Sequence, residues 1–196
     1  MLNNLILILG GAKSGKSSFA LDLGMKSKKK VTYLVTAGYS DREMSARIEK
    51  HRKSRPKDWQ TVEVDKHIVS SLGDLEKEAG LIIIDCWSFY VANLLNREVS
   101  VDPGEDIIKP DVYGKLEKQV TEETNSLVRE IGNLNSKVIV VSNEVGLGLV
   151  PPYPLGRCFR DLLGLSHQLL AKQASEVYFM FAGLPLELSG NIITLP

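Results

Sequence analysis

The sequence predicts an α/β fold with a mostly parallel sheet and helices on both faces of that sheet. Short aliphatic runs alternate along the chain with longer amphipathic stretches, which is the order of β and α segments in such folds. The aliphatic runs are apolar throughout instead of alternating with polar residues, and this is typical of parallel strands covered on both faces. We expect a single domain over residues 1–196.

The element order follows from these patterns. The strands are predicted at 5–9, 31–36, 81–85, 137–142 and 177–182, with 191–195 as a last edge strand. The helices are predicted at 16–26, 41–53, 94–96 with the turn before it, 111–131 and 156–174. Residues 97–113 contain Pro103, Gly104, Pro110 and several acids, so they are predicted to form a surface excursion and not a domain boundary.

Composition and charge exclude several classes of protein. With 43% hydrophobic residues and 2 Cys, the chain is not a disordered, collagen-like or disulfide-scaffold protein. Its formal net charge of zero provides no long-range field for nucleic acid or an anionic membrane. No window approaches the roughly 18–20 consecutive apolar residues that cross a bilayer, and no basic leader segment precedes the first strand. We therefore expect a cytoplasmic protein without a membrane span or a nucleic-acid partner.

Neither cysteine is predicted to hold a metal. Cys86 and Cys158 lie far apart in the sequence, and with three histidines no structural zinc spacing can be assembled. We expect both to be small buried residues.

A phosphate-binding loop is predicted directly after the first strand, with the spacing G-x-x-x-x-G-K-[ST]. Glycine at both ends lets successive backbone N–H groups converge on a phosphate, and the following helix adds its N-terminal dipole. The lysine would reach the terminal phosphates, and the serine hydroxyl would bind Mg²⁺. The fold is thus predicted to be P-loop NTPase-like, a RecA-like three-layer sandwich. The loop comprises Gly10, Gly11, Ala12, Lys13, Ser14, Gly15, Lys16 and Ser17.

A second metal ligand is predicted at Asp85. The aliphatic run 81–85 carries this one carboxylate to the carboxyl edge of the sheet, where open α/β sheets bind their ligands. We expect Asp85 to hold a hydrated Mg²⁺ together with Ser17. The alternative is an aspartate that merely caps the segment after the strand.

A candidate nucleophile lies on the predicted helix 41–53. Met44, Arg47, Ile48, His51 and Arg55 share one face of it. The arginines would bind phosphate oxygens and disfavour the imidazolium, so that a neutral imidazole could attack phosphorus. Helix spacing alone favours a packed histidine over a nucleophile.

The other two histidines lack such cationic neighbours. We expect His67 and His167 to be structural or exposed to solvent.

Several motifs together resemble the adenosylcobinamide kinase / adenosylcobinamide-phosphate guanylyltransferase family of cobalamin biosynthesis. Residues 10–17 are similar to its P-loop, and residues 43–52 are similar to its E-M-x-x-R-I-x-x-H-[RK] helix. Residues 55–63 resemble its R-P-x-x-W-x-T-x-E segment. Residues 142–151 and 157–161 resemble T-N-E-V-G-x-G-I-V-P and R-x-F-R-D.

The resemblance implies two reactions. The γ-phosphate of GTP or ATP, bound with Mg²⁺, goes to the hydroxyl of adenosylcobinamide. GTP then guanylylates the histidine that matches His51, and the GMP passes to adenosylcobinamide phosphate to give adenosylcobinamide-GDP. The resemblance also implies a homo-oligomer, typically a trimer. It implies catalytic roles for His51 and Lys16, and further nucleotide contacts from Val35, Thr36, Ala37, Arg52, Lys53, Ser54, Arg55 and Glu63.

Two other functions remain as alternatives from the residues themselves. A simple small-metabolite or nucleoside kinase would use the same loop and Asp85 but would need no histidine nucleophile. A GTP-driven switch would be expected to carry Asn-Lys-x-Asp for guanine, whereas the loop after the fourth predicted strand starts at Asn143 and reads Asn-Glu-Val-Gly.

Overall fold

The computed structural model describes residues 1–36, 55–64, 68–77, 79–98 and 107–189. Its strands form a seven-stranded sheet in the order β3-β2-β4-β5-β1-β6-β7. All neighbours are parallel except the β6–β7 pair, which is antiparallel. The strands are β1 (Leu2–Gly10), β2 (Val31–Thr36), β3 (Gln60–Val64), β4 (Leu81–Asp85), β5 (Lys137–Asn143), β6 (Ala174–Phe181) and β7 (Leu184–Glu187).

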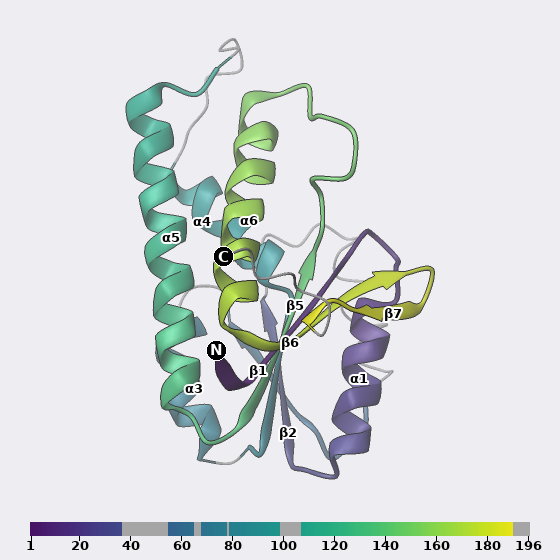
Figure 1. The fold of residues 1–196 in the computed structure, drawn as a ribbon. Helices are drawn as coiled ribbons and strands as arrows, with labels where there is room; N and C mark the ends of the chain where they lie inside the picture. Colours follow the sequence, from purple (N-terminus) through teal and green to yellow (C-terminus); the bar gives the residue numbers. More distant parts are fainter. Residues whose placement is uncertain (37–54, 65–67, 78, 99–106, 190–196) are drawn as a thin grey trace, which may run out of the picture.

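Helices cover both faces of the sheet, so the predicted three-layer α/β fold is confirmed (Figure 1). One face carries α3 (Ile68–Glu76), α4 (Trp87–Glu98), α5 (Pro110–Asn133) and α6 (Pro154–Gln173). The other face carries, among the described helices, α1 (Lys16–Ser27). None of the described helices is long and apolar enough to span a membrane.

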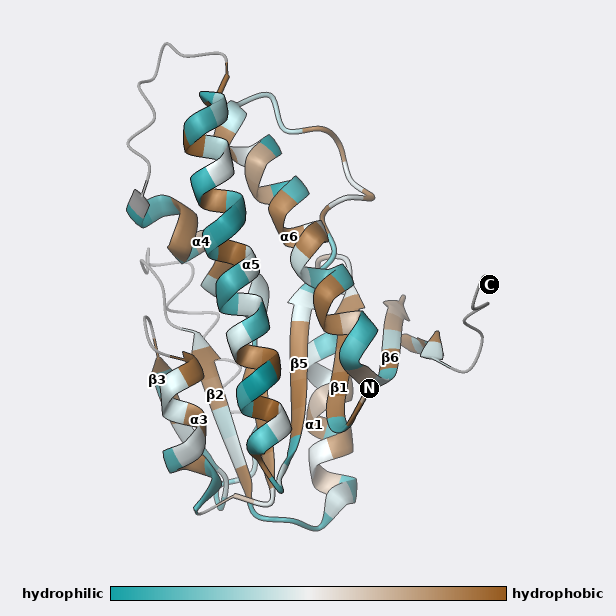
Figure 2. Cartoon of the chain, turned by 60° about the vertical axis from the view of Figure 1, so that its left-hand side comes forward, coloured by the Kyte–Doolittle hydropathy of each residue, from teal (hydrophilic) through white to brown (hydrophobic). Residues whose placement is uncertain are grey.

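Two apolar clusters hold the layers together, because side chains of a strand alternate between its faces. Leu5, Leu7 and Leu9 of β1 pack toward α3–α6, whereas Ile6 and Ile8 pack toward α1. Figure 2 shows β1 and β5 as mostly hydrophobic strands in the interior of the molecule. Both cysteines are buried and free, as predicted.

The parallel register brings several strand ends to one edge of the sheet. Gly10 pairs with Asn143 and with Met180, and Val35 pairs with Asp85. The P-loop therefore starts beside the carboxyl ends of β5 and β6, and Asp85 ends the strand on the other side of β5. This edge is where ligands bind in open α/β sheets.

Several predicted boundaries need correction. The strand β3 and the helix α3 were absent from the prediction, and the predicted segment 94–96 is the end of the longer helix α4. The predicted excursion 97–113 is shorter than expected, since Arg97 and Glu98 belong to α4 and α5 begins at Pro110.

The predicted edge strand 191–195 and the predicted helix 41–53 lie outside the described residues. The last described strand is β7, whose four residues are all exposed. This exposure explains why β7 was not predicted, because the prediction relied on apolar runs that are typical of covered strands.

Candidate nucleotide site

The P-loop has the backbone geometry that its two outer glycines permit. Gly15 has φ +97°, in the region that L side chains rarely adopt, and a Cβ there would meet Cα of Gly183 at 3.1 Å. At Gly10 a Cβ would lie 2.7 Å from Oγ of Ser14 and 2.8 Å from the carbonyl oxygen of Met180. Side chains at Gly10 and Gly15 would therefore clash with neighbouring atoms and distort the loop.

Lys16 is buried at the first residue of α1. Its Nζ donates to the carbonyl oxygen of Gly11 at 2.6 Å and lies 3.4 Å from Oγ of Ser14. Burial lowers the pKa of Lys16, and the charges of Cys86 and Asp85 oppose this effect. The lysine thus lies across the loop, where its ammonium group can contact phosphate oxygens. Ser17 follows it in the first turn of the helix, half-buried.

A hydrogen bond from a buried tyrosine orients the carboxylate of Asp85. The hydroxyl of Tyr33 donates to Oδ2 of Asp85, and the ring of Tyr33 is only 1% exposed. Burial and the neighbouring carboxylate raise the pKa of Tyr33, so its hydroxyl stays protonated and remains a donor. The guanidinium of Arg55 stacks on the same ring, 3.9 Å from its centroid.

The carboxyl ends of β2 and β3 hold a second group of predicted residues. Val35 and Thr36 are buried, and Oγ1 of Thr36 exchanges hydrogen bonds with the backbone of Cys86 at 2.8 and 3.1 Å. Glu63 pairs with Val35 across these strands and is exposed. Arg55 donates weakly to Oγ1 of Thr61 at 3.4 Å.

The structure thus brings the predicted residues together in two groups. Gly10 to Ser17 lie near Asp85, while Val35, Thr36, Arg55 and Glu63 lie at β2 and β3, and Tyr33 contacts both Asp85 and Arg55. Five predicted site residues lie outside the described ones: Ala37, His51, Arg52, Lys53 and Ser54.

Among the described residues, no group of three His, Cys, Asp or Glu side chains could hold a metal ion by itself. A hydroxyl at Ser17 and a single carboxylate at Asp85 nevertheless fit Mg²⁺, which keeps several waters and binds through one or two protein oxygens plus substrate phosphates. The donor set therefore suits a metal that arrives with a nucleotide.

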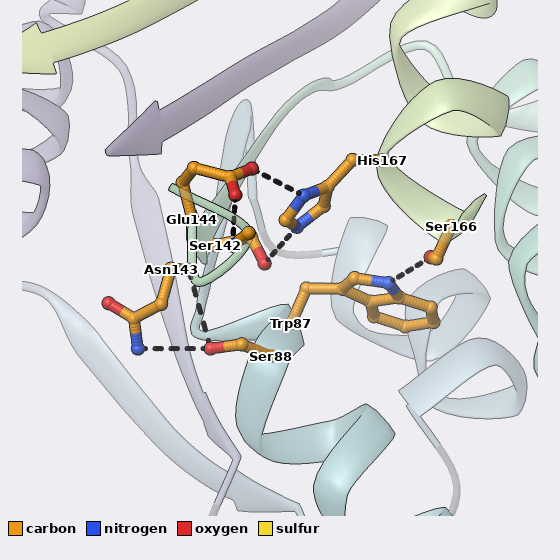
Figure 3. Close-up of polar contacts among 8 residues, drawn as sticks. Trp87, Ser88, Ser142, Asn143, Glu144, Ser166 and His167 are labelled. Atoms are coloured by element: carbon orange, nitrogen blue, oxygen red, sulfur yellow. Dashed lines mark hydrogen bonds and ion pairs between the residues drawn. The ribbon is translucent and has the colours of Figure 1, made fainter. Parts of the chain in front are cut away.

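A buried histidine beside the loop was not predicted as part of the site. His167 of α6 is buried, its Nε2 lies 2.7 Å from Oγ of Ser142, and its Nδ1 lies 3.5 Å from Oε2 of Glu144 (Figure 3). Its expected structural role agrees with this burial. Its contact with Glu144 joins residues 23 positions apart, which no spacing rule indicates.

Glu144 connects this pair to the P-loop. Its backbone N–H donates to the carbonyl oxygen of Gly10 at 2.8 Å. Its side chain lines a cavity of about 320 Å³ that is also lined by Gly11, Ala12, Lys13 and Ser14. Sequence reasoning noted Glu144 within a motif but gave it no function.

The sequence model of the cobinamide kinase / cobinamide phosphate guanyltransferase family matches residues 6–188. The chain belongs to this family. Membership gives the chain the two activities that name the family, within cobalamin biosynthesis. The family resemblance expected from the sequence is therefore confirmed.

Curated relatives agree with this family. The chain is 38% identical over 186 residues to the bifunctional adenosylcobalamin biosynthesis protein CobP of Pseudomonas aeruginosa, covering 94% of this chain and 97% of that protein. It is 37% identical over 186 residues to CobU of Escherichia coli, covering 94% and 99%. Among solved structures, a RadB recombinase aligns with a TM-score of 0.44 at 17% identity, covering 89% of this chain and 73% of that chain.

Proposed function

We propose that the chain phosphorylates adenosylcobinamide with GTP or ATP and then transfers GMP to the product through a guanylyl-histidine at His51. The arrangement of Lys16, Ser17 and Asp85 around one P-loop is the observation that carries the first step. The second step is supported by family membership and by the sequence around His51. Both steps draw on nucleotide pools of the cytoplasm, which is the location we propose.

In the kinase step the loop amides and Lys16 bind the β- and γ-phosphates and offset the charge that spreads over the transferred group. Ser17 and Asp85 would hold Mg²⁺, which supplies charge neutralisation between these phosphates when bound. Tyr33 orients the carboxylate of Asp85 by donating to one of its oxygens. The hydroxyl of adenosylcobinamide forms the new O–P bond, and the nucleoside diphosphate leaves.

In the guanylyl step a ring nitrogen of His51 attacks the α-phosphorus of GTP and pyrophosphate leaves. The phosphate of adenosylcobinamide phosphate then displaces the imidazole from phosphorus, which gives adenosylcobinamide-GDP. We assign Arg55 and Glu63 to the nucleotide of this second reaction, with Val35, Thr36, Ala37, Arg52, Lys53 and Ser54 beside it. The stacking of Arg55 on Tyr33 supports this assignment, because it places a cation on the tyrosine whose hydroxyl donates to Asp85.

Labelling with GTP tests the guanylyl step. α-Labelled GTP should leave acid-labile, alkali-stable label on the wild-type protein and none on His51→Ala, whereas γ-labelled GTP should leave none on either. Phosphorylation of adenosylcobinamide should persist in His51→Ala. A wild-type protein that phosphorylates adenosylcobinamide but takes no α-label would support the simple kinase instead.

We also propose that the chain assembles into a homo-oligomer, a trimer by family resemblance. The hairpin β6–β7 supports this, because Phe181, Leu184 and Leu186 expose 57%, 73% and 51% of their surface on it. Light scattering of the purified protein should give a mass of about three chains. Leu186→Lys should shift the mass toward the monomer, whereas Lys118→Ala on the distant surface of α5 should not.

A further inference from the structure

Glu144 lies between the P-loop and α6, and its side chain lines the cavity beside the loop. Of the described residues that line its cavity it is the sole acid, and the loop residues Gly11 to Ser14 line the same cavity. The hydrogen bond from its backbone to Gly10 fixes its Cα relative to the loop.

The side chain of Glu144 is also fixed at both oxygens. Oε1 accepts from the backbone N–H of Gly146, and Oε2 faces Nδ1 of His167 at 3.5 Å. The side chain of Glu144 is 19% exposed and that of His167 is 7% exposed, so Glu144 retains contact with solvent while the histidine behind it is buried. The exposed part of the Glu144 side chain is available to a substrate.

His167 is itself held in one orientation. Nε2 lies 2.7 Å from Oγ of Ser142, a residue with no exposed surface, so the ring is fixed between a hydroxyl and a carboxylate. Ser142 precedes Asn143 in β5, and the side chain of Asn143 donates to Oγ of Ser88 at 3.1 Å. Three consecutive polar residues at the end of β5 are thus all engaged beside the loop.

The imidazole of His167, 3.5 Å from Oε2, and then the N–H groups of Gly146 and Leu147 hold the pKa of Glu144 below its ordinary value despite partial burial. The group is therefore an ionised acceptor at neutral pH. Asp85 does not serve in the same way, because its carboxylate is assigned to the metal.

We propose that Glu144 is a catalytic residue of the kinase step, which binds the acceptor hydroxyl and takes its proton, and that His167 is the positioning residue that holds it. The hydroxyl oxygen forms the bond to the γ-phosphorus, the bond from that phosphorus to the β-bridging oxygen breaks with its electron pair on the diphosphate, and the hydroxyl proton passes to Glu144. This inference rests on the kinase half of the proposed function.

The guanylyl half supplies an internal control. Attack by a histidine nitrogen on GTP involves no acceptor hydroxyl, so Glu144→Gln should slow only phosphorylation. In single-turnover experiments with γ-labelled ATP or GTP and adenosylcobinamide, we expect the phosphorylation rate of Glu144→Gln to be about 100-fold or more below that of the wild type. The nucleotide Kd and the α-label on the protein should change by less than about threefold.

His167 is tested with a pair of amides. The amide nitrogen of Asn can replace Nδ1 and that of Gln can replace Nε2, so His167→Asn keeps the donor toward Glu144 and His167→Gln keeps the contact with Ser142. We expect His167→Gln to lose roughly tenfold in the phosphorylation rate and His167→Asn to retain most of it. Ser166→Ala, the neighbour on α6 that contacts Trp87 instead, is the matched control and should keep the rate.

The outcomes separate the two claims. A wild-type protein that phosphorylates adenosylcobinamide with neither nucleotide overturns the kinase assignment together with the role of Glu144. An active wild type with Glu144→Gln within about threefold of it overturns the role of Glu144 alone. Equal losses in His167→Asn and His167→Gln would show a merely structural role for His167.

Discussion

The hydroxyl of Tyr33 donates a hydrogen bond to the carboxylate of Asp85 across two neighbouring strands. Val35 is the residue opposite Asp85, so the tyrosine reaches along the sheet from two residues earlier on the same face. The buried tyrosine therefore supports a carboxylate at the ligand edge through its hydroxyl while Arg55 stacks on the face of its ring.

Removal of this hydroxyl should weaken the kinase without unfolding the protein. We expect Tyr33→Phe to lower phosphorylation of adenosylcobinamide by about tenfold and to raise the Mg²⁺ concentration required, because Asp85 loses its orienting donor. Activity measured against Mg²⁺ concentration checks this. Tyr90→Phe removes a hydroxyl bonded to Glu123 on α5 and should leave the Mg²⁺ dependence unchanged.

Lys16 should be essential for phosphoryl transfer. We expect Lys16→Ala to abolish kinase turnover and to weaken nucleotide binding, since the loop loses its buried cation. Titration calorimetry with GTP and a turnover assay measure the two effects. Lys26→Ala, on the exposed last turn of the same helix, is the control, and unchanged turnover in Lys16→Ala would remove the lysine from the mechanism.

A buried polar contact between α4 and α6 should affect stability alone. The indole N–H of Trp87 donates to Oγ of Ser166 at 2.7 Å, and both groups are buried. Ser166→Ala leaves that donor without its partner and should lower the free energy of unfolding by about 1–3 kcal/mol. Urea denaturation measures the loss, and a change below about 0.3 kcal/mol would show that the indole finds another acceptor.

Glu144 should stabilise the folded protein at neutral pH, and this stabilisation should be lost in acid. Because its pKa is lower in the folded protein, folding favours the ionised form, and this contribution is complete above its ordinary value of 4.5. It is lost as the pH falls from there through the folded pKa. The difference in unfolding free energy between wild type and Glu144→Gln should therefore be constant at neutral pH and shrink below pH 4.5. A difference that grows in acid would contradict the lowered pKa.

Local signals in the sequence account for the features that were predicted correctly. The P-loop is contiguous, and β1, β2, β4 and β5 are buried over most of their length, so each contains a run of mostly apolar residues. The strand β3 is a short, half-exposed edge strand without that pattern, and β7 is exposed along its whole length. Their place depends on pairing with β2 and β6 and not on their own hydrophobicity.

The contacts of the site were harder to predict than its residues. Tyr33 lies within an apolar run and gave no sign of a link to Asp85, which is 52 residues away. His167 was expected to be structural or exposed to solvent because it lacks the cationic neighbours of His51 in the sequence. Its proximity to Glu144 arises from the packing of α6 over the end of β5, which only the folded chain specifies.

The P-loop is bound to a late part of the chain. Gly183, in the turn between β6 and β7, donates its N–H to the carbonyl oxygen of Ser14 at 2.9 Å, and β1 lies between β5 and β6. During translation the glycine loop is made before either flanking strand, and it lacks the second of them until β6 has left the ribosome. Nascent chains stalled before residue 174 should thus have no affinity for GTP, because β6 has not yet been made.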